Sequence, residues 1–251
     1  MMRIPKMLWC YWGRTPMSQL QALTIESFRR HNPTWEITLI RPKDECSGPI
    51  IWDSPEQSVP YTGHDFSSLT SFTRCMIFDF EEAGFDVKSH DVKKADFVRW
   101  HVLHKYGGVW SDLDIYYLRP IPDDWLDCAC GCGSFVVRTG RTIQLGFVGS
   151  SGGQYARELM ASLTRRDLVL EATRILPYRW SVYPYLPSET ARLFAPPPWS
   201  EVELARAAIV CHESVGVHWY NGSPHAKQAI NSGNLGLMGT IIGQSAEIIR
   251  W

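Results

Sequence analysis

A chain of 251 residues with 45% hydrophobic and 20% charged residues has enough apolar material to bury a core, which argues against an intrinsically disordered protein. Its formal net charge of -1 lacks the basic surplus that proteins use to bind the nucleic-acid backbone. No run of about 18 apolar residues and no apolar leader before a cleavage site occurs, so we expect no membrane span and a cytoplasmic location. From the length we expect one domain over residues 1–251.

The first forty residues alternate between strand and helix patterns. Apolar residues from Ile4 to Trp12 predict a strand, and the spacing of apolar residues from Met17 to His31 predicts a helix that Asn32-Pro33 ends. Alternation from Trp35 to Ile40 predicts a second strand. A strand, a helix and a strand in this order are typical of a parallel sheet covered by helices, so we expect an α/β fold.

The most regular helix pattern runs from Asp91 to Gly108 and ends at the Gly107-Gly108 pair, which suits the left-handed conformation at helix ends. Val109 to Ser111 then predicts a short strand, which places Asp112 and Asp114 just beyond its carboxyl end. Ligands bind at such strand ends in open α/β sheets. The apolar stripe expected on the helix consists of Val92, Ala95, Val98, Val102, Leu103 and Tyr106.

One residue separates Asp112 from Asp114, so in an extended segment their carboxylates leave the same side of the chain. A hard cation such as Mn²⁺ or Mg²⁺ prefers oxygen ligands, and it typically takes one or two carboxylates together with the phosphates of a substrate. Such a cation stabilises the negative charge on a departing nucleotide diphosphate. The alternative is a turn in which two exposed aspartates have no catalytic role.

Asp96 and Arg99 stand at positions i and i+3 of the predicted helix, so their side chains meet on one face. Either they form an ordinary surface ion pair, or they supply hydrogen bonds to the hydroxyls of a bound sugar. His101 and His104 have the same spacing, and we interpret them as a helix-surface pair because no H-E-x-x-H metal motif accompanies them.

The stretch from Asp96 to Asp114 closely resembles the D-x-x-R, L-x-x-x-G-G, D-x-D signature of the glycosyltransferases with a sugar-binding region. That grouping includes the yeast-type mannosyltransferases, bacterial capsular sugar transferases and the catalytic domains of clostridial glucosylating toxins. Ile4 to Lys6 and the tryptophan before Gly13 resemble the family's opening strand, I-P-K-x-(I/V)-H-x-x-W-x-G. Here Trp9 stands in place of the histidine, and one residue fewer separates the tryptophan from the glycine.

The resemblance implies a GT-A-like fold, which is an α/β nucleotide-binding sandwich with a mostly parallel central sheet flanked by helices. It also implies a retaining, hexosyltransferase-like enzyme that uses Mn²⁺ or Mg²⁺ and a nucleotide-diphosphate sugar, with a UDP-sugar favoured. Carried over position by position, Asp96 and Arg99 would bind the donor sugar, and Trp12 would stack on the base. Asp112 would bind ribose and sugar, and Asp114 would ligate the metal.

Residues Val217 to Gly222 are the best match to the C-terminal segment with which this family closes its site. His218 would be a metal ligand, and Trp219 and Tyr220 would bind the nucleotide or sugar, with the Trp219 indole N–H donating to a phosphate oxygen. The alternative is a buried aromatic strand end. The family's small-residue T-G-P stretch is matched only by Leu186-Pro187-Ser188. We expect residues 1–120 to bind the donor and residues 121–251 to form the acceptor side.

The acceptor expected from the resemblance is a glycan hydroxyl, followed by a protein side chain and by a hydroxylated base in nucleic acid. Lys93-Lys94 and Arg165-Arg166 would serve a nucleic-acid acceptor, although such pairs usually lie on a solvated helix face. Two other functions stay open: a noncatalytic carbohydrate-binding protein, which eleven tryptophans and ten tyrosines would suit, and a metal-dependent sugar-nucleotide hydrolase. Motifs of phosphate-binding-loop enzymes and dinucleotide oxidoreductases are missing from the sequence.

Overall fold

The computed structural model describes residues 3–13, 15–44, 61–127, 133–139, 142–164, 173–177, 182–184 and 193–248. The stretch Leu186-Pro187-Ser188 and the Arg165-Arg166 pair lie outside the described residues. Among the described residues, no helix combines the length and the apolar character that crossing a bilayer requires.

Strands and helices alternate through the first half of the chain and give way to helices near its end. The strands are β1 (Met7–Tyr11), β2 (Glu36–Pro42), β3 (Arg74–Phe78), β4 (Gly108–Ser111), β5 (Ile115–Tyr117), β6 (Ser134–Thr139), β7 (Thr142–Ser150), β8 (Thr173–Pro177), β9 (Val182–Pro184) and β10 (Gly216–His218). The helices are α1 (Gln19–His31), the 3-10 helix η1 (Ser67–Thr70), α2 (Asp91–Tyr106), α3 (Asp123–Leu126), α4 (Gly153–Thr164), α6 (Glu201–Glu213), α7 (Pro224–Ser232) and α8 (Gly236–Ile248).

Seven strands form one sheet in the order β3-β2-β1-β4-β7-β6-β8, and three form a smaller sheet in the order β5-β10-β9. In the large sheet β3, β2, β1 and β4 are parallel to their neighbours, β7 is antiparallel to β4 and β6, and β8 is parallel to β6. The predicted α/β class, with a mostly parallel central sheet flanked by helices, is confirmed.

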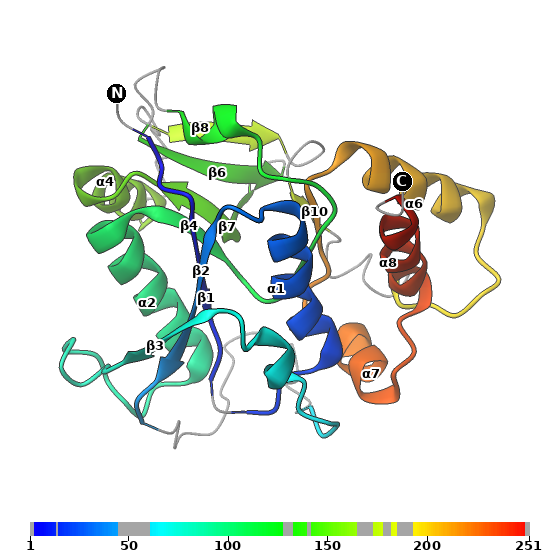
Figure 1. The fold of residues 1–251 in the computed structure, drawn as a ribbon, viewed down its shortest axis with the longest axis horizontal. Helices are drawn as coiled ribbons and strands as arrows, with labels where there is room; N and C mark the ends of the chain where they lie inside the picture. Colours follow the sequence, from blue (N-terminus) through cyan, green and yellow to red (C-terminus); the bar gives the residue numbers. More distant parts are fainter. Residues whose placement is uncertain are drawn as a thin grey trace.

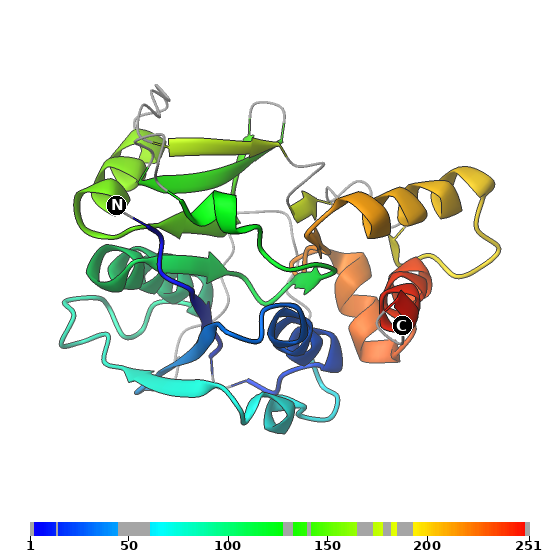
Figure 2. The same ribbon diagram turned by 45° about the horizontal axis from the view of Figure 1, so that its top comes forward.

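Helices cover both faces of the large sheet: α2 and α4 lie on one face, and α1 lies on the other (Figures 1 and 2). The alternation of side chains along β1 supplies both layers, because successive strand residues point to opposite faces. Leu8 and Cys10 are buried in the core under α1, whereas Trp9 and Tyr11 are buried in the core under α2 and α4. The predicted strand–helix–strand unit of the first forty residues is confirmed, since β1 and β2 are parallel.

Helix α1 begins and ends where local hydrogen bonds replace the missing helical ones. Ser18 and Gln21 form a capping box at its start, in which the Ser18 hydroxyl accepts from the Gln21 backbone N–H. At its end the Asn32 backbone N–H donates to the Phe28 carbonyl at 2.9 Å. The Asn32 side chain also accepts a hydrogen bond from the Ile121 backbone N–H at 2.9 Å, so the helix end is fixed to a distant loop.

Helix α2 ends at a turn that needs glycine. Gly107 and Gly108 have φ angles of 69° and 103°, in the left-handed region that residues with a Cβ rarely adopt. A Cβ on Gly108 would lie 2.7 Å from the Met7 carbonyl oxygen, so the close approach of the start of β4 to β1 also requires glycine. Trp9 donates its indole N–H to the Gly107 carbonyl at 2.7 Å. Trp9, which stands where the family pattern has a histidine, therefore fixes the turn before Asp112 and Asp114.

The buried face of α2 is rotated from the predicted stripe. Val92 and Ala95 are only half-buried, and Tyr106 is 41% exposed, where it stacks on Trp9 at a centroid distance of 5.4 Å. Lys94 is 1% exposed, which contradicts the expectation that the Lys93-Lys94 pair lies on a solvated face or forms a basic patch. The buried residues of α2 are Lys94, Val98, Arg99, Val102 and Leu103.

The three C-terminal helices form a third packed layer beside α1 (Figure 1). Residues of α6, α7 and α8 share a buried cluster with Leu20 of α1 and with Tyr116 of β5. Strand β10 leads into this layer and pairs antiparallel with β5, so that His218 stands opposite Ile115. This pairing brings the C-terminal segment next to the residues that follow β4.

Candidate functional site

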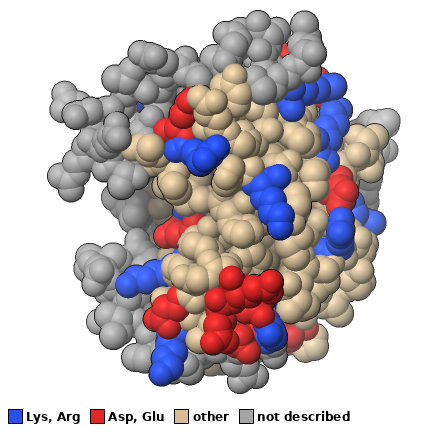
Figure 3. All heavy atoms as spheres, turned by 90° about the vertical axis from the view of Figure 1, so that its left-hand side faces the viewer, with Lys and Arg blue, Asp and Glu red and all other residues tan. Residues whose placement is uncertain are grey.

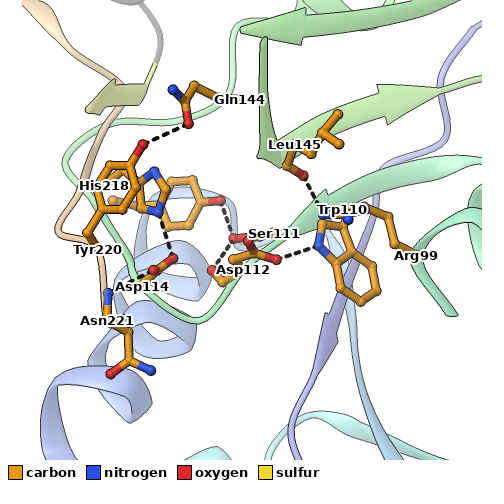
Figure 4. Close-up of polar contacts among 11 residues, drawn as sticks. Arg99, Trp110, Ser111, Asp112, Asp114, Gln144, Leu145, His218, Tyr220 and Asn221 are labelled. Atoms are coloured by element: carbon orange, nitrogen blue, oxygen red, sulfur yellow. Dashed lines mark hydrogen bonds and ion pairs between the residues drawn. The ribbon is translucent and has the colours of Figure 1, made fainter. Parts of the chain in front are cut away.

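The acidic motif leaves the carboxyl end of β4 and is fixed by the strand beside it. The Asp112 backbone N–H donates to the Gly146 carbonyl of β7 at 2.8 Å, and Asp112 Oδ1 accepts from the Trp110 indole N–H at 2.7 Å (Figure 4). Ser111 donates its hydroxyl to the Asp112 carbonyl at 2.9 Å. Burial raises the pKa of Asp112, the Arg99 guanidinium opposes this rise, and the nearby Asp114 charge adds to it.

Asp114 contacts the C-terminal segment from Val217 to Gly222. Asp114 Oδ2 accepts from the Asn221 backbone N–H at 2.9 Å, and Oδ1 lies 3.0 Å from His218 Nε2. The His218 side chain is only 8% exposed. Burial pushes the pKa of Asp114 up, but the nearby charge of His218 and the hydrogen bond from the Asn221 backbone N–H leave that pKa below its ordinary value. Burial pushes the pKa of His218 down, but Asp114 outweighs burial and raises it.

The predicted contact between Asp96 and Arg99 is confirmed, because the two side chains form an ion pair. The pair is unlike an ordinary surface bridge: the Arg99 side chain is 5% exposed, while that of Asp96 is 58% exposed. Arg99 Nη1 donates to the Leu145 carbonyl at 3.0 Å, and the guanidinium lies 5.7 Å from the ring centroid of Trp110. Arg99 is therefore held from the sheet side, and Asp96 lies at the surface.

Trp12 is the residue expected to stack on the nucleotide base. It is half-buried just after β1, it packs against the core under α1, and its indole N–H donates to the Thr15 carbonyl at 2.8 Å. The base-stacking role of Trp12 stays a prediction.

The sequence predicts His101 and His104 as a pair on the helix surface. His101 is half-buried, and its ring lies 5.0 Å from that of Phe78, whereas His104 is exposed.

The aromatic residues after His218 have two different environments. Trp219 is fully buried, its ring lies 6.3 Å from that of Phe194, and its indole N–H has no hydrogen-bond partner among the described residues. The Tyr220 ring stacks on His218 at a centroid distance of 4.2 Å and an interplanar angle of 16°. The Tyr220 hydroxyl donates to Gln144 Oε1 at 3.0 Å (Figure 4). Trp219 thus matches the expected buried strand end, and Tyr220 lies in the site.

Three consecutive residues of β7, to which the sequence analysis assigned no role, hold the site together. Gln144 accepts from Tyr220, the Leu145 carbonyl accepts from Arg99, and the Gly146 carbonyl accepts from Asp112, as described above. The available sequence signal was Gly146 itself, because a glycine inside a strand pattern often marks a bulge or a close approach.

A divalent cation fits the residues around Asp114. His218 Nε2 is close to Asp114 Oδ1, yet this buried oxygen has no aligned hydrogen-bond donor among the described residues. A Cβ on Gly146 would lie 2.9 Å from Asp112 Oδ2 and 3.5 Å from His218 Cε1, so the missing side chain leaves space between these groups. Within the described ranges, no group of three or more His, Cys, Asp or Glu side chains is arranged to hold a metal. A cation here would need oxygen ligands from the substrate as well.

Comparison with solved structures finds glycosyltransferases of low sequence identity. The PaToxG glycosyltransferase is 15% identical, with a TM-score of 0.43 over 68% of this chain and 64% of that one, so this chain spans less than two thirds of its length. The galactosyltransferase LgtC, in complex with donor and acceptor sugar analogues, is 8% identical, with a TM-score of 0.44 over 94% and 99% of the two chains. The apo form of GlyE from Streptococcus pneumoniae is 10% identical, with a TM-score of 0.48 over 96% and 62%.

Comparison with protein families identifies the region around the site. No curated protein matches the chain. Residues 18–130 match the family described as the glycosyltransferase sugar-binding region containing a DXD motif. This match includes α1, α2, β4 and the acidic motif. The resemblance found in the sequence is therefore confirmed over residues 18–130, which match the sugar-binding region of the DXD-containing glycosyltransferases.

Proposed function

We propose that this chain is a metal-dependent, retaining, hexosyltransferase-like enzyme that moves a sugar from a nucleotide-diphosphate sugar, first of all a UDP-sugar, to a glycan hydroxyl. The observation that carries the proposal is the convergence of separate segments at one strand end. Asp114 pairs with His218, while Asp112 and Arg99 bond to adjacent carbonyls of β7. We include in the proposal that residues 1–251 act as one domain, with the donor part near 1–120 and the acceptor side near 121–251.

Asp114 and His218 would hold Mn²⁺ or Mg²⁺ together with phosphate oxygens of the donor. The buried Asp114 oxygen without an aligned donor and the space beside Gly146 support this assignment. A bound cation supplies positive charge that stabilises the departing nucleotide diphosphate. Asp112 would bind ribose and sugar from the opposite side of the same space.

The remaining residues would position the donor. Arg99 and the exposed Asp96 would hydrogen-bond the sugar hydroxyls, and Trp12 would stack on the base. Tyr220 would line the nucleotide or sugar site from the side of His218. Trp219 would reach a phosphate oxygen only after a movement of the surrounding core, because it is fully buried.

In the proposed reaction, the bond between the anomeric carbon and the phosphate oxygen breaks while the acceptor oxygen bonds to that carbon on the same face. The acceptor proton passes to an oxygen of the leaving diphosphate. No side chain is assigned as a covalent nucleophile. Positioning and electrostatic stabilisation would then account for most of the rate enhancement.

A glycan remains the first proposed acceptor, ahead of a protein side chain and a nucleic-acid base. The burial of Lys94 removes one of the two basic pairs considered for nucleic acid. On the face that includes α2 and α4, acidic side chains of the described residues gather in one patch in the lower part of the view, while basic side chains are scattered around it (Figure 3). Binding to the nucleic-acid backbone would favour a continuous basic surface.

The test is transfer from a panel of UDP- and GDP-sugars with Mn²⁺, followed by mass spectrometry of added acceptors. We expect Asp114→Asn to lower transfer at least about 10²-fold, the scale for removing one electrostatic stabiliser. Asp86→Asn, in an exposed turn before α2, is the matched control and should leave transfer unchanged. Wild-type turnover in Asp114→Asn would contradict the proposal. Donor cleavage without transfer to any acceptor would point to a hydrolase, and sugar binding without metal or turnover would point to a carbohydrate-binding protein.

A further inference from the structure

Strand β7 has a bulge at the point where it holds the site. In its ladder with β6, Val148 pairs with Val136, but the next pair joins Gln144 to Val137. Residues 145–147 of β7 therefore have no partner on β6. Bulges free backbone groups from the ladder and re-aim side chains, often beside active sites. The bulge directly follows Gln144, and the Leu145 carbonyl within it accepts from Arg99.

Tyr220 has a backbone conformation that needs support from its surroundings. Its φ angle is 53°, and it is the only non-glycine residue with a positive φ among those that the structure describes. A residue with a Cβ adopts this conformation at a cost, and such residues persist where neighbouring contacts hold them. Among the contacts that hold the side chain are the stack on the His218 ring and the hydrogen bond from its hydroxyl to Gln144.

Among the described residues, His218 has no partner of the kind that usually orients a metal-binding imidazole. Such a histidine normally donates its second ring nitrogen to a carboxylate or carbonyl, which fixes the ring. No hydrogen bond is found at His218 Nδ1 within the described part of the chain, while Nε2 lies 3.0 Å from Asp114 Oδ1. The nearly parallel Tyr220 ring covers one face of the imidazole and limits its rotation.

We propose that Gln144 is a positioning residue for the cation site. By holding the Tyr220 hydroxyl, it keeps the Tyr220 ring against His218 and so keeps His218 Nε2 beside Asp114 (Figure 4). This inference rests on the proposed function, because it concerns the affinity of that same site for a divalent cation. Gln144 acts through two aromatic rings and makes no direct contact with the cation.

The test measures Mn²⁺ binding by electron paramagnetic resonance, with UDP present and without turnover, in Gln144→Leu, Tyr220→Phe and the double variant. Each single variant removes the same hydrogen bond and keeps the Tyr220 ring or its phenylalanine equivalent. We expect each to weaken Mn²⁺ binding about 10-fold, the lower end of the effect of residues that orient metal ligands. The double variant should lose no more than either single one, since both changes remove one interaction.

The control is Tyr61→Phe, which removes a hydroxyl that donates to the His64 carbonyl in a loop outside this group of contacts. It should bind Mn²⁺ like the wild type. In transfer assays, Gln144→Leu should raise the KM for Mn²⁺ and leave the kcat at saturating Mn²⁺ nearly unchanged.

The outcomes separate this inference from the proposed function. Wild-type Mn²⁺ affinity in both single variants, while Asp114→Asn abolishes binding, would overturn the role of Gln144 and leave the proposed function standing. Losses that add in the double variant would also overturn it, because Gln144 and Tyr220 would then act separately. A wild-type protein that does not bind Mn²⁺ in the presence of UDP would refute both.

Discussion

Replacing Gly146 by alanine tests whether the space between the acidic motif and His218 is needed. The new Cβ would lie 2.9 Å from Asp112 Oδ2 and 3.4 Å from its Cγ. The carboxylate would have to move by about 0.5 Å, because favourable carbon contacts begin near 3.5 Å. Asp112 Oδ1 is held by the Trp110 indole at 2.7 Å, so the movement strains a hydrogen bond to a charged group, worth about 1.5–3 kcal/mol.

We expect Gly146→Ala to lower kcat/KM for the donor sugar at least about 10-fold, since a displacement of about 1 Å in a catalytic group can cost about 10²-fold. Crowding of the strand should lower the free energy of unfolding by about 1–3 kcal/mol. Steady-state transfer kinetics and urea unfolding measure the two effects separately.

Gly239→Ala is the matched control for this substitution. Gly239 lies inside α8, and its added Cβ would meet only the Leu235 Cβ, at an ordinary 3.5 Å. It should keep full activity and gain about 0.5–1 kcal/mol in stability. Wild-type kcat/KM in Gly146→Ala would refute the view that this space serves the donor and its cation.

Two further outcomes follow from the contacts around the site. Trp9→Phe removes the hydrogen bond to the Gly107 carbonyl and leaves a small cavity. We therefore expect the free energy of unfolding in urea to fall by about 2–3 kcal/mol. An unchanged urea midpoint would contradict the role of Trp9 in the turn. Asp114 raises the pKa of His218 in the folded protein above 6.5, its ordinary value in the unfolded chain. Protonated His218 therefore stabilises the fold fully at a pH below 6.5, and this stabilisation declines as the pH rises through the folded pKa. Thermal melts from pH 6 to pH 9 should therefore decline less in His218→Gln than in the wild type, and parallel curves would argue against the ion pair.

Local signals in the sequence were sufficient for the elements that lead to the acidic motif. The Asn32-Pro33 stop lies directly after His31, the last residue of the helix that it ends. The Gly107-Gly108 pair marks the end of α2 for the same reason, because only glycine tolerates the backbone there. The i, i+3 contact of Asp96 with Arg99 follows from helix geometry alone.

Helix periodicity was less informative about which face of α2 is buried. The predicted stripe included Tyr106, which is 41% exposed, and left out Lys94, which is 1% exposed. A lysine chain can cover apolar surface with its methylene groups, and a hydropathy pattern does not register this. Which side of α2 meets the sheet depends on the neighbouring strands and on α4, and their positions are not encoded in the helix itself.

The assembly of the site depends on contacts between segments that are distant in the chain. His218 lies beside Asp114 because β10 pairs with β5, and strand pairing of this kind is set by the packing of whole layers. Gln144 reaches Tyr220 because β7 bulges against β6, which no local pattern except Gly146 indicated. A sequence pattern specifies backbone preferences over a few residues, so it identified the carboxylates and the helix before them. The partners that orient these carboxylates come from the free energy of packing the entire chain, and only the tertiary structure identifies them.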